Sequence, residues 1–394
     1  MRPPQPSACA VLPRVLLVSS TLEDDGGGPV CVGQLAEALA GIGVPVGVVG
    51  QHAGPLAAVI DGAARGSGVE VEGVRELWHP LGQWRAAARV RSLVRQAATR
   101  ARSEGRDLVV HLHGVWVAPV LAAGHVAMDV GATLVVSPHG MLRREALFKS
   151  PLRKRAVWEV CLRRLLVAAD TLHVTSPREG EDLATLLPGS HSVLVPLGVV
   201  PPPDAPCARP QGRLRRAGYL GRILPIKNLD LLLRAWSAVR PEGWRLSIDG
   251  PGPADVTAAL RELAVRLGIG ADVDIGGPVP MSRLGEHFAA LDLFVLPSRS
   301  EAFALTVGEA LASGVPAVVT TEAPWGGVET HRCGWSVPPT LAGLTDAIAH
   351  ATALSAADLA SMGQRGRAWV RDDYAWKEIA RRHLTQLYGV PGPW

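Results

Sequence analysis

Short runs of apolar residues alternate along the chain with longer segments in which apolar residues recur every three or four positions. The short runs predict buried strands and the longer segments predict helices, the first over Val30–Ala40 and ended by Gly41. Such alternation is typical of an α/β protein with a parallel, doubly wound sheet. In the first half of the chain the predicted strands are Val15–Ser19, Val44–Val49, Leu108–Leu112, Thr133–Val136, Leu172–Thr175 and Val193–Val195.

A proline-rich segment divides this pattern into two halves. Six prolines lie between Pro196 and Pro210, a density that favours an extended linker. We therefore predict two Rossmann-like domains that face each other across a ligand-binding cleft, residues 1–200 and 201–375, with a C-terminal helix over 376–394 that braces both. The predicted strands of the second domain are Ala217–Leu220, Arg245–Asp249, Val273–Ile275, Leu293–Leu296 and Ala317–Val319.

Composition excludes several classes of protein. A chain of 394 residues with 47% hydrophobic and 19% charged residues can build ordinary cores, so disorder is not expected. No run of about 18 apolar residues predicts a transmembrane helix, and prolines near the N-terminus argue against a signal peptide. Five scattered cysteines without a CxxC pair favour a reducing compartment over a zinc site. We expect a cytoplasmic protein that needs no metal.

The net charge of +4 is unevenly distributed. Residues 142–166 carry eight basic and two acidic side chains, a net charge of +6 that leaves −2 for the remainder. Ser150 and Pro151 suit the start of a helix with apolar positions at Leu152, Ala156, Trp158, Leu162 and Leu165. Two interpretations stay open: this helix lies on an anionic membrane, peripheral to the inner face of the cytoplasmic membrane, or its apolar stripe packs on its own domain. Nucleic acid is a less favoured partner, since aromatic residues are not interleaved with the basic ones.

Two glutamates eight residues apart, Glu301 and Glu309, carry the clearest chemical signal. They flank the start of a helix predicted over Ala304–Ala312, which follows the strand Leu293–Leu296. A helix N-terminus at that place suits phosphate, because free backbone N–H groups and the helix dipole meet there. Carboxylates on both sides fit a nucleotide sugar, with Glu301 accepting from the sugar and Glu309 from the ribose. The alternative is structural, since a glutamate before a helix is often only a favourable partner of the dipole.

Loops after other predicted strands add candidate phosphate ligands. Arg222 and Lys227 leave the strand Ala217–Leu220 together, where a guanidinium and an ammonium can grip a diphosphate. The glycine run Gly26–Gly28 permits close approach of the backbone before a helix. This run does not match the GxGxxG fingerprint, so a nicotinamide cofactor is not supported.

In this order and spacing, GRILPIK, IDGPGP, IGGPVP and FVLPSRSEAFALTVGEALASGVPAVVT resemble the retaining glycosyltransferases of family 4, which have the GT-B fold. HLHGVW, SPHGML, WSVPP and RDDYAWKEIA are similar to the bacterial surface-polysaccharide branch of that family. The resemblance covers nearly the whole chain. It implies transfer of a sugar, with retention, from a nucleotide diphosphate-sugar to a hydroxyl of a glycan or lipid-linked acceptor, without a cofactor.

The resemblance also implies roles for individual residues. Arg222 and Lys227 would stabilise the leaving diphosphate, Glu301 would hold sugar hydroxyls, and His139 would lie near the transferred sugar; these four form the implied catalytic set. His113 and Trp116 are the implied acceptor-binding residues. The implied donor-binding residues are Gly26, Gly27, Gly28, Gly221, Gly250, Pro278, Phe303, Ala304, Leu305 and Glu309.

Three departures from the family pattern and one acidic motif need interpretation. Trp325-Gly326-Gly327 in APWGG resembles the usual turn of the branch, with more backbone freedom. Ala304 stands where the family commonly has glycine, and we expect it to adopt a helical φ with modest crowding. Leu197 replaces a common asparagine, which changes the expected hinge contacts. The DVD sequence at Asp272–Asp274 opens a strand, and we interpret it as structural rather than metal-binding. The alternative functions are a sugar-nucleotide epimerase, a phosphorylase with the same fold, or an inactive nucleotide-sugar-binding scaffold.

Overall fold

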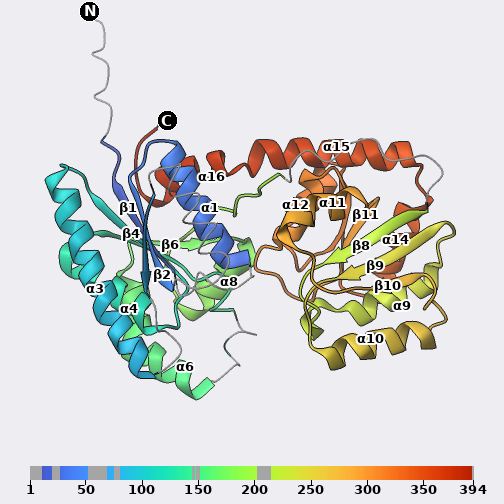
Figure 1. The fold of residues 1–394 in the computed structure, drawn as a ribbon, viewed down its shortest axis with the longest axis horizontal. Helices are drawn as coiled ribbons and strands as arrows, with labels where there is room; N and C mark the ends of the chain where they lie inside the picture. The colour runs from blue at the N-terminus through green and yellow to red at the C-terminus, as the bar shows by residue number, and fades with distance from the viewer. Residues whose placement is uncertain are drawn as a thin grey trace, which may run out of the picture. The chain divides into compact units, whose positions relative to one another are not determined.

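The computed structural model describes residues 11–19, 27–51, 69–74, 80–143, 147, 151–201 and 214–392 (Figure 1). The chain forms two compact units. The first unit comprises Met1–Gly198 together with Trp376–Trp394, and the second comprises Val199–Ala375. The C-terminal segment therefore returns to the first unit.

The first unit is built on a seven-stranded parallel sheet in the order β3-β2-β1-β4-β5-β6-β7. Alternate side chains of β1 enter two separate hydrophobic clusters, Val15 and Leu17 in one and Leu16 and Val18 in the other. Burial on both faces explains the continuous apolar runs in the sequence. The strands are β1 (Arg14–Ser19), β2 (Val46–Gln51), β3 (Glu70–Val74), β4 (Leu108–His113), β5 (Thr133–Ser137), β6 (Thr171–Val174) and β7 (Ser192–Leu194).

Helices cover both faces of this sheet (Figure 1). On one face lie α3 (Pro80–Ser103), α4 (Ala118–Val130) and α7 (Arg163–Ala168), and α3 packs along α4. On the other face lie α1 (Gly27–Gly41), α16 (Trp376–Arg382) and the π-helical turn η4 (His383–Leu387). The remaining described helices of the unit are α6 (Pro151–Val157), the π-helical turn η1 (Trp158–Leu162) and α8 (Pro177–Leu186).

The second unit is built on a six-stranded parallel sheet in the order β10-β9-β8-β11-β12-β13. Its strands are β8 (Arg215–Leu220), β9 (Trp244–Asp249), β10 (Val273–Ile275), β11 (Leu293–Leu296), β12 (Ala317–Thr320) and β13 (Gly334–Val337). Its helices are η2 (Pro225–Lys227), α9 (Leu229–Val239), α10 (Ala254–Arg266), η3 (Met281–Arg283), α11 (Leu284–Ala289), α12 (Leu305–Ala312), α13 (Gly327–Thr330), α14 (Leu341–Ala353) and α15 (Ala356–Asp373). α9 packs on α14, and α12 packs on α15.

Both sheets reverse their strand order at one point, between β1 and β4 in the first unit and between β8 and β11 in the second. In doubly wound sheets, ligands bind at the carboxyl ends of the strands beside such a reversal. The predicted fold class, α/β with two Rossmann-like parallel sheets, is confirmed.

Two strands were absent from the sequence prediction, β3 and β13, and both lie at a sheet edge. β3 reads EVEGV, with two glutamates and a glycine, and β13 is the four-residue GWSV. An edge strand pairs on one side only and tolerates polar side chains, so its apolar signal is weak.

Residues 151–168 form a helix interrupted by a π-helical turn, whereas we expected a regular one. The Arg163 N–H donates to Trp158 O, five residues back, and this wider turn rotates the helical face that follows it. Of the predicted apolar stripe, Leu162 and Leu165 are buried, while Leu152 and Ala156 are exposed. The stripe is therefore confirmed for its C-terminal part and wrong for its N-terminal part. The predicted N-cap, Ser150, lies outside the described residues.

Candidate active site

The loops after β8 and β11 meet at the reversal point of the second sheet and bring Lys227 to Glu301. Lys227 Nζ lies 2.6 Å from Glu301 Oε1, and Ser298 Oγ donates to the same oxygen at 2.6 Å. The Lys227 side chain is 16% exposed and that of Glu301 is 8% exposed. Two donors thus hold the carboxylate in place, while part of the cation reaches solvent.

Backbone geometry holds these two loops in register. Lys227 ends the 3-10 turn η2, and Asn228 follows it with a left-handed φ of +59°. Asn228 Nδ2 donates to Pro297 O at 3.1 Å, and the Arg299 N–H donates to Ile226 O at 2.9 Å. The ammonium and the carboxylate are therefore preorganised before any ligand binds.

Arg222 lies on the same edge of the sheet, with an exposed side chain. The fully buried Tyr219 fixes its backbone by donating from Oη to Arg222 O at 2.9 Å. Burial and the charge of Glu301 raise the pKa of Tyr219, so the phenol stays protonated as a donor. The structure therefore places both predicted cations after β8.

The glycine turns predicted as donor ligands are also required by close packing of the backbone. A Cβ on Gly250 would overlap the carbonyl of Gly221, and a Cβ on Gly221 would lie 2.8 Å from Tyr219 Oη. The Gly250 N–H donates to Gly277 O at 2.9 Å, which joins the loops after β9 and β10, and Pro278 follows with an exposed ring. These turns thus lie together at the carboxyl edge of the second sheet.

The helix that carries Glu309 begins at Leu305, and our prediction for Ala304 is wrong. Ala304 has φ +64° and ψ +65°, a left-handed conformation, where we expected a helical φ. The reason is the sharp turn into α12, which costs an L-residue about 1–2 kcal/mol and a glycine almost nothing. The Phe303 side chain is buried beside Trp325, so only its backbone can face a ligand.

Glu309 lies in the second turn of α12 and is half-buried. Burial raises the pKa of its carboxyl to about 7. Hydroxyl groups that donate hydrogen bonds to such a carboxyl stabilise its charged form. The position therefore suits a ligand with adjacent hydroxyls better than a second phosphate.

His113 and His139 come together at the carboxyl edge of the first sheet. His113 ends β4, His139 follows β5 with a left-handed φ of +51°, and His113 Nδ1 lies 2.9 Å from His139 Nε2. Their rings stack with centroids 5.1 Å apart. Burial lowers the pKa of His139 to about 4, so this imidazole is neutral at pH 7.

A chain of hydrogen bonds runs behind this pair. Tyr388 Oη lies 2.9 Å from His111 Nδ1, and His111 Nε2 lies 2.6 Å from Ser137 Oγ. Ser137 Oγ contacts His173 Nδ1, and His173 Nε2 lies 2.8 Å from Val195 O. Since a carbonyl can only accept, His173 donates through Nε2, and every step then has one donor and one acceptor with neutral rings.

Trp116, predicted to bind the acceptor, already uses its donor inside the protein. Its Nε1–H donates to Met141 O at 3.0 Å, and Lys154 Nζ lies 5.2 Å from the ring centroid. The half-buried ring also packs on the core of the first unit. Its role toward an acceptor stays a prediction.

Of the predicted glycine loop of the first unit, Gly27 and Gly28 open α1 after β1, and Gly26 lies outside the described residues. Their predicted contact with phosphates stays a prediction.

Sequence reasoning missed the residues that support the site from behind. The most informative is Glu179 in α8, which is buried and accepts from the Gly140 N–H beside His139 and from the Thr175 N–H. Its signal was present as a capping box, since Ser176 caps α8 and accepts from the Glu179 N–H. The other missed supports are Ser298, Tyr219, His111, Ser137, His173 and Tyr388, and the contact of Trp325 with the start of α12 was missed as well.

The described residues contain no group of three or more His, Cys, Asp or Glu side chains that could hold a metal ion. Asp272 and Asp274 are exposed, and Asp274 lies 3.8 Å from Arg245. Within the same part of the chain, no helix is long and apolar enough to cross a membrane.

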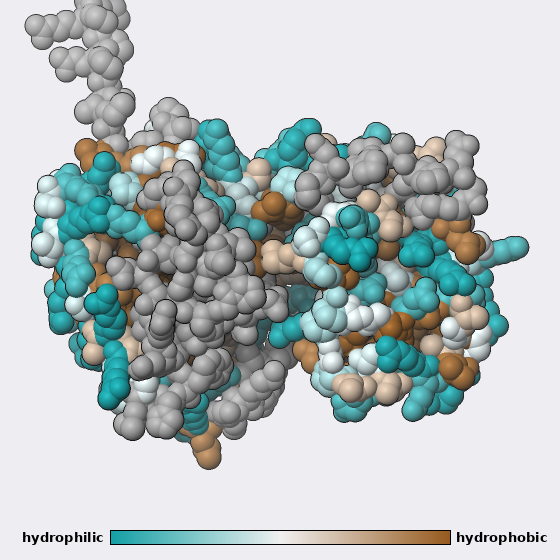
Figure 2. All heavy atoms as spheres, viewed as in Figure 1, coloured by the Kyte–Doolittle hydropathy of each residue, from teal (hydrophilic) through white to brown (hydrophobic). Residues whose placement is uncertain are grey.

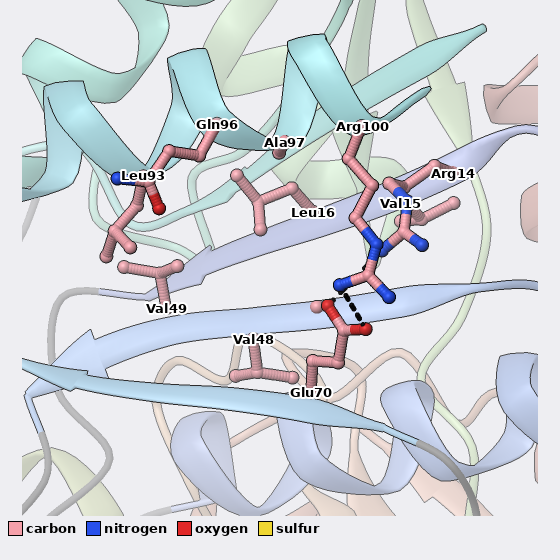
Figure 3. A pocket seen from close by; sticks show the side chains of 11 residues that line it. Arg14, Val15, Leu16, Val48, Val49, Glu70, Leu93, Gln96, Ala97 and Arg100 are labelled. Atoms are coloured by element: carbon pink, nitrogen blue, oxygen red, sulfur yellow. Dashed lines mark hydrogen bonds and ion pairs between the residues drawn. The ribbon is translucent and has the colours of Figure 1, made fainter. Parts of the chain in front are cut away.

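A cavity of about 190 Å³ lies between α3 and strands β1 to β3 of the first unit (Figure 3). Its rim includes Arg14 and Glu70, the first residues of β1 and β3, and Arg100 pairs with Glu70 at 2.6 Å. The cavity thus lies toward the amino edge of the first sheet, while His113 and His139 lie at its carboxyl edge.

Comparison with known proteins agrees with this fold. Residues 26–198 match the family described as glycosyl transferase 4-like domain, and residues 215–353 match the family described as glycosyl transferases group 1. D-inositol 3-phosphate glycosyltransferase of Mycobacteroides abscessus is 34% identical over 251 residues, 58% of this chain and 55% of the relative. The chain thus spans about half the length of that relative.

Three further proteins are similar to this chain, one by sequence and two by fold. GDP-mannose-dependent alpha-(1-6)-phosphatidylinositol monomannoside mannosyltransferase of Mycolicibacterium smegmatis is 29% identical over 295 residues, 69% of this chain and 74% of the relative. The structure of Anabaena Alr3699/HepE in complex with UDP and glucose superposes with a TM-score of 0.73 at 17% identity, over 96% of this chain and 100% of that one. The structure of sucrose-phosphate synthase from Thermosynechococcus elongatus superposes with a TM-score of 0.68 at 21% identity, over 95% of this chain and 98% of that one. With two consecutive family matches along one chain and this fold, the protein belongs to the group 1, family 4-like glycosyltransferases of the GT-B fold.

Proposed function

We propose that the protein transfers a hexosyl group from a nucleotide diphosphate-sugar to an acceptor hydroxyl, with retention and without a metal. The observation that carries this proposal is the 2.6 Å contact between Lys227 and Glu301 at the reversal point of the second sheet, just before α12. A cation, a helix N-terminus and a fixed carboxylate suit one ligand that carries both phosphates and hydroxyls.

In this mechanism the protein stabilises the leaving group and forms no covalent bond to the sugar. The bond between the anomeric carbon and the diphosphate breaks, the bond to the acceptor oxygen forms on the same face, and the departing phosphate takes the acceptor proton. Lys227, Arg222 and the N-terminal dipole of α12 would neutralise the charge that develops on the diphosphate. Because Ser298 and Lys227 already orient Glu301, the sugar hydroxyls meet a fixed acceptor.

Glu309 and His139 would complete the donor contacts. Hydroxyls of the ribose would donate to Glu309 and favour its charged form, against the burial that raises its pKa to about 7. His139 would lie near the transferred sugar as a neutral imidazole, held by His113 and by the Glu179-bound loop.

A lipid-linked or surface-polysaccharide acceptor is supported by the outer face of residues 151–168. Leu152, Val160 and Val167 are 84%, 81% and 66% exposed. Exposed arginines surround them, and Figure 2 shows hydrophobic and hydrophilic surface side by side over α6. Leu162 and Leu165 meanwhile pack inward, so the segment has a separate apolar face available for a membrane. The relative from M. smegmatis acts, by its name, on a phosphatidylinositol mannoside.

Sedimentation with anionic liposomes tests this membrane contact. The wild type is expected to bind, with binding weakened by salt, and replacing Leu152, Val160 and Val167 by serine is expected to reduce binding about tenfold or more. Trp84→Ser is the matched control, because Trp84 is 68% exposed on α3, outside this segment. Equal binding of the triple variant and the wild type would show that the outer face does not contact lipid.

A thermal-shift screen against UDP, GDP, ADP and their sugars tests the donor site. At least one nucleoside diphosphate is expected to raise the melting temperature, since a ligand that binds only the folded state stabilises it. The stabilising donor should then release its nucleoside diphosphate slowly in the presence of the protein. Stabilisation without release would favour an inactive scaffold, and conversion of the sugar without release would favour an epimerase.

A further inference from the structure

Trp325 contacts the entrance of α12 at two levels. Its Nε1–H donates to Phe303 O at 2.6 Å and to Ala304 O at 3.1 Å. Its six-membered ring lies against Gly308, where a Cβ would come within 2.9 Å of Trp325 Cη2. Trp325 is fully buried. One indole therefore fixes both the cap of α12 and the turn that carries Glu309.

An N–H group that attracts two successive carbonyls also sets the direction of two successive N–H groups. In a trans peptide the C=O and N–H bonds point in opposite directions. The carbonyl of Phe303 shares its peptide with the Ala304 N–H, and the carbonyl of Ala304 shares its peptide with the Leu305 N–H. Both carbonyls turn toward the indole, so both N–H groups point away from it, at a helix end whose first N–H groups have no partner within the helix.

The indole can act in this way because aromatic neighbours hold it. Tyr374 stacks on it with centroids 4.8 Å apart and an interplanar angle of 29°. Trp369 meets it edge-on at 5.7 Å. The indole also offsets the unfavourable left-handed conformation of Ala304, since its hydrogen bonds are made only when the backbone at Phe303 and Ala304 turns inward.

We propose that Trp325 is a positioning residue for the diphosphate of the donor. It touches no ligand, but it aims the N–H groups of Ala304 and Leu305 at the phosphate oxygens. This inference rests on the proposed function, because it assigns these two N–H groups to the diphosphate of the nucleotide-sugar donor.

Trp325→Phe tests the inference, because phenylalanine keeps an aromatic ring and removes the N–H. By calorimetry, the variant is expected to bind the nucleoside diphosphate preferred by the wild type about five- to tenfold more weakly. The ratio of its affinities for the nucleoside diphosphate and the corresponding monophosphate should be smaller than in the wild type. Trp369→Phe is the matched control: it lies in the same aromatic cluster, but its Nε1–H donates to Asp373 within α15, at 3.0 Å. Trp369→Phe should bind the diphosphate within about twofold of the wild type.

Ala304→Gly supplies a second, independent readout. Glycine adopts a left-handed φ freely, so Trp325→Phe should weaken binding less in the Ala304→Gly background than in the wild type. If Trp325→Phe does not fold, replacing Trp325 by benzothienylalanine keeps the shape of the indole without its N–H.

Two results would overturn the inference: a Trp325 variant that binds the diphosphate as tightly as the wild type, or equal losses in the Trp325 and Trp369 variants. Failure of the wild type to bind UDP, GDP or ADP would instead refute the proposed function itself, so the two failures are distinguishable.

Discussion

Replacement of Lys227 by alanine is expected to lower kcat for sugar transfer by about 10²–10³-fold, the usual effect of removing one preorganised group that stabilises charge in the transition state. The side chain lies where the leaving diphosphate would develop charge, and the Ser298–Glu301 contact holds its partner in place. KM should rise less than kcat falls, because charge on the leaving group is greatest in the transition state. Initial rates with the donor found by thermal shift measure both constants.

Stability must be separated from chemistry in this variant, since Lys227→Ala leaves the buried Glu301 carboxylate without its cation. Melting curves of the variant reveal that cost, and Lys227→Arg should recover most of the stability but only part of kcat, because a guanidinium cannot reproduce the point charge. Lys377→Ala, at an exposed position of α16, is the matched control and should retain wild-type rates. Turnover of Lys227→Ala close to that of the wild type would remove Lys227 from the mechanism.

Acidification is expected to unfold the first unit between about pH 6.5 and 4. Desolvation by burial lowers the pKa of His139 and His173 to about 4 and that of His383 to about 3, and it places those of His111 and His113 well below their ordinary value. For His173, the hydrogen bond to Val195 O and, to a smaller extent, the charge of Glu179 partly offset this lowering of the pKa, while His139 adds repulsion.

The sign of this effect follows from the direction of the pKa shifts. Well above pH 6.5 the histidines are neutral in both the folded and the unfolded chain, so no stability is lost. Below pH 6.5 the imidazoles bind protons in the unfolded chain, but in the folded chain they stay neutral until about pH 4. For His139, His173 and His383 together, the loss in free energy of unfolding is roughly 4 kcal/mol at pH 5.5 and roughly 8 kcal/mol at pH 4.5, comparable with the total stability of a domain.

Urea unfolding at several pH values, followed by hydrogen exchange resolved by peptide, measures this loss. Peptides of the first unit should lose protection as the pH falls. His383→Phe should make the free energy of unfolding depend less on pH, because His383 is fully buried and binds a proton only in the unfolded chain over this pH range. His191→Phe, at an exposed position, should leave the dependence unchanged. A urea midpoint that stays constant from pH 7.5 to pH 5 would show that these histidines are not held neutral.

The predictable part of the fold was the part that burial dictates. Central strands such as β1 and β4 are covered on both faces, so their apolar runs identify them without tertiary information. β3 and β13 were not predicted, because an edge strand needs no such apolar run. The π-helical turn at Trp158 was not predicted, because the helical spacing of apolar residues does not indicate one extra residue in a turn.

The site also has a part that could be predicted from the sequence and a part that could not. The proximity of Lys227 and Glu301 was predictable because loops at the carboxyl ends of parallel strands converge, whatever their separation in sequence. The left-handed Ala304 was not, since alanine favours helix and the sharp turn into α12 is held by Trp325, twenty-one residues later. The histidine chain was invisible for the same reason, because His111 meets Tyr388 only after the C-terminus has returned to the first unit.

The central claim, retaining transfer from a nucleotide diphosphate-sugar, is tested most directly by proton NMR of the reaction mixture with an α-linked donor. The account predicts release of the nucleoside diphosphate together with a sugar or glycoside whose first-formed anomer is α. First formation of the β anomer, or no release from any UDP-, GDP- or ADP-sugar, would contradict it.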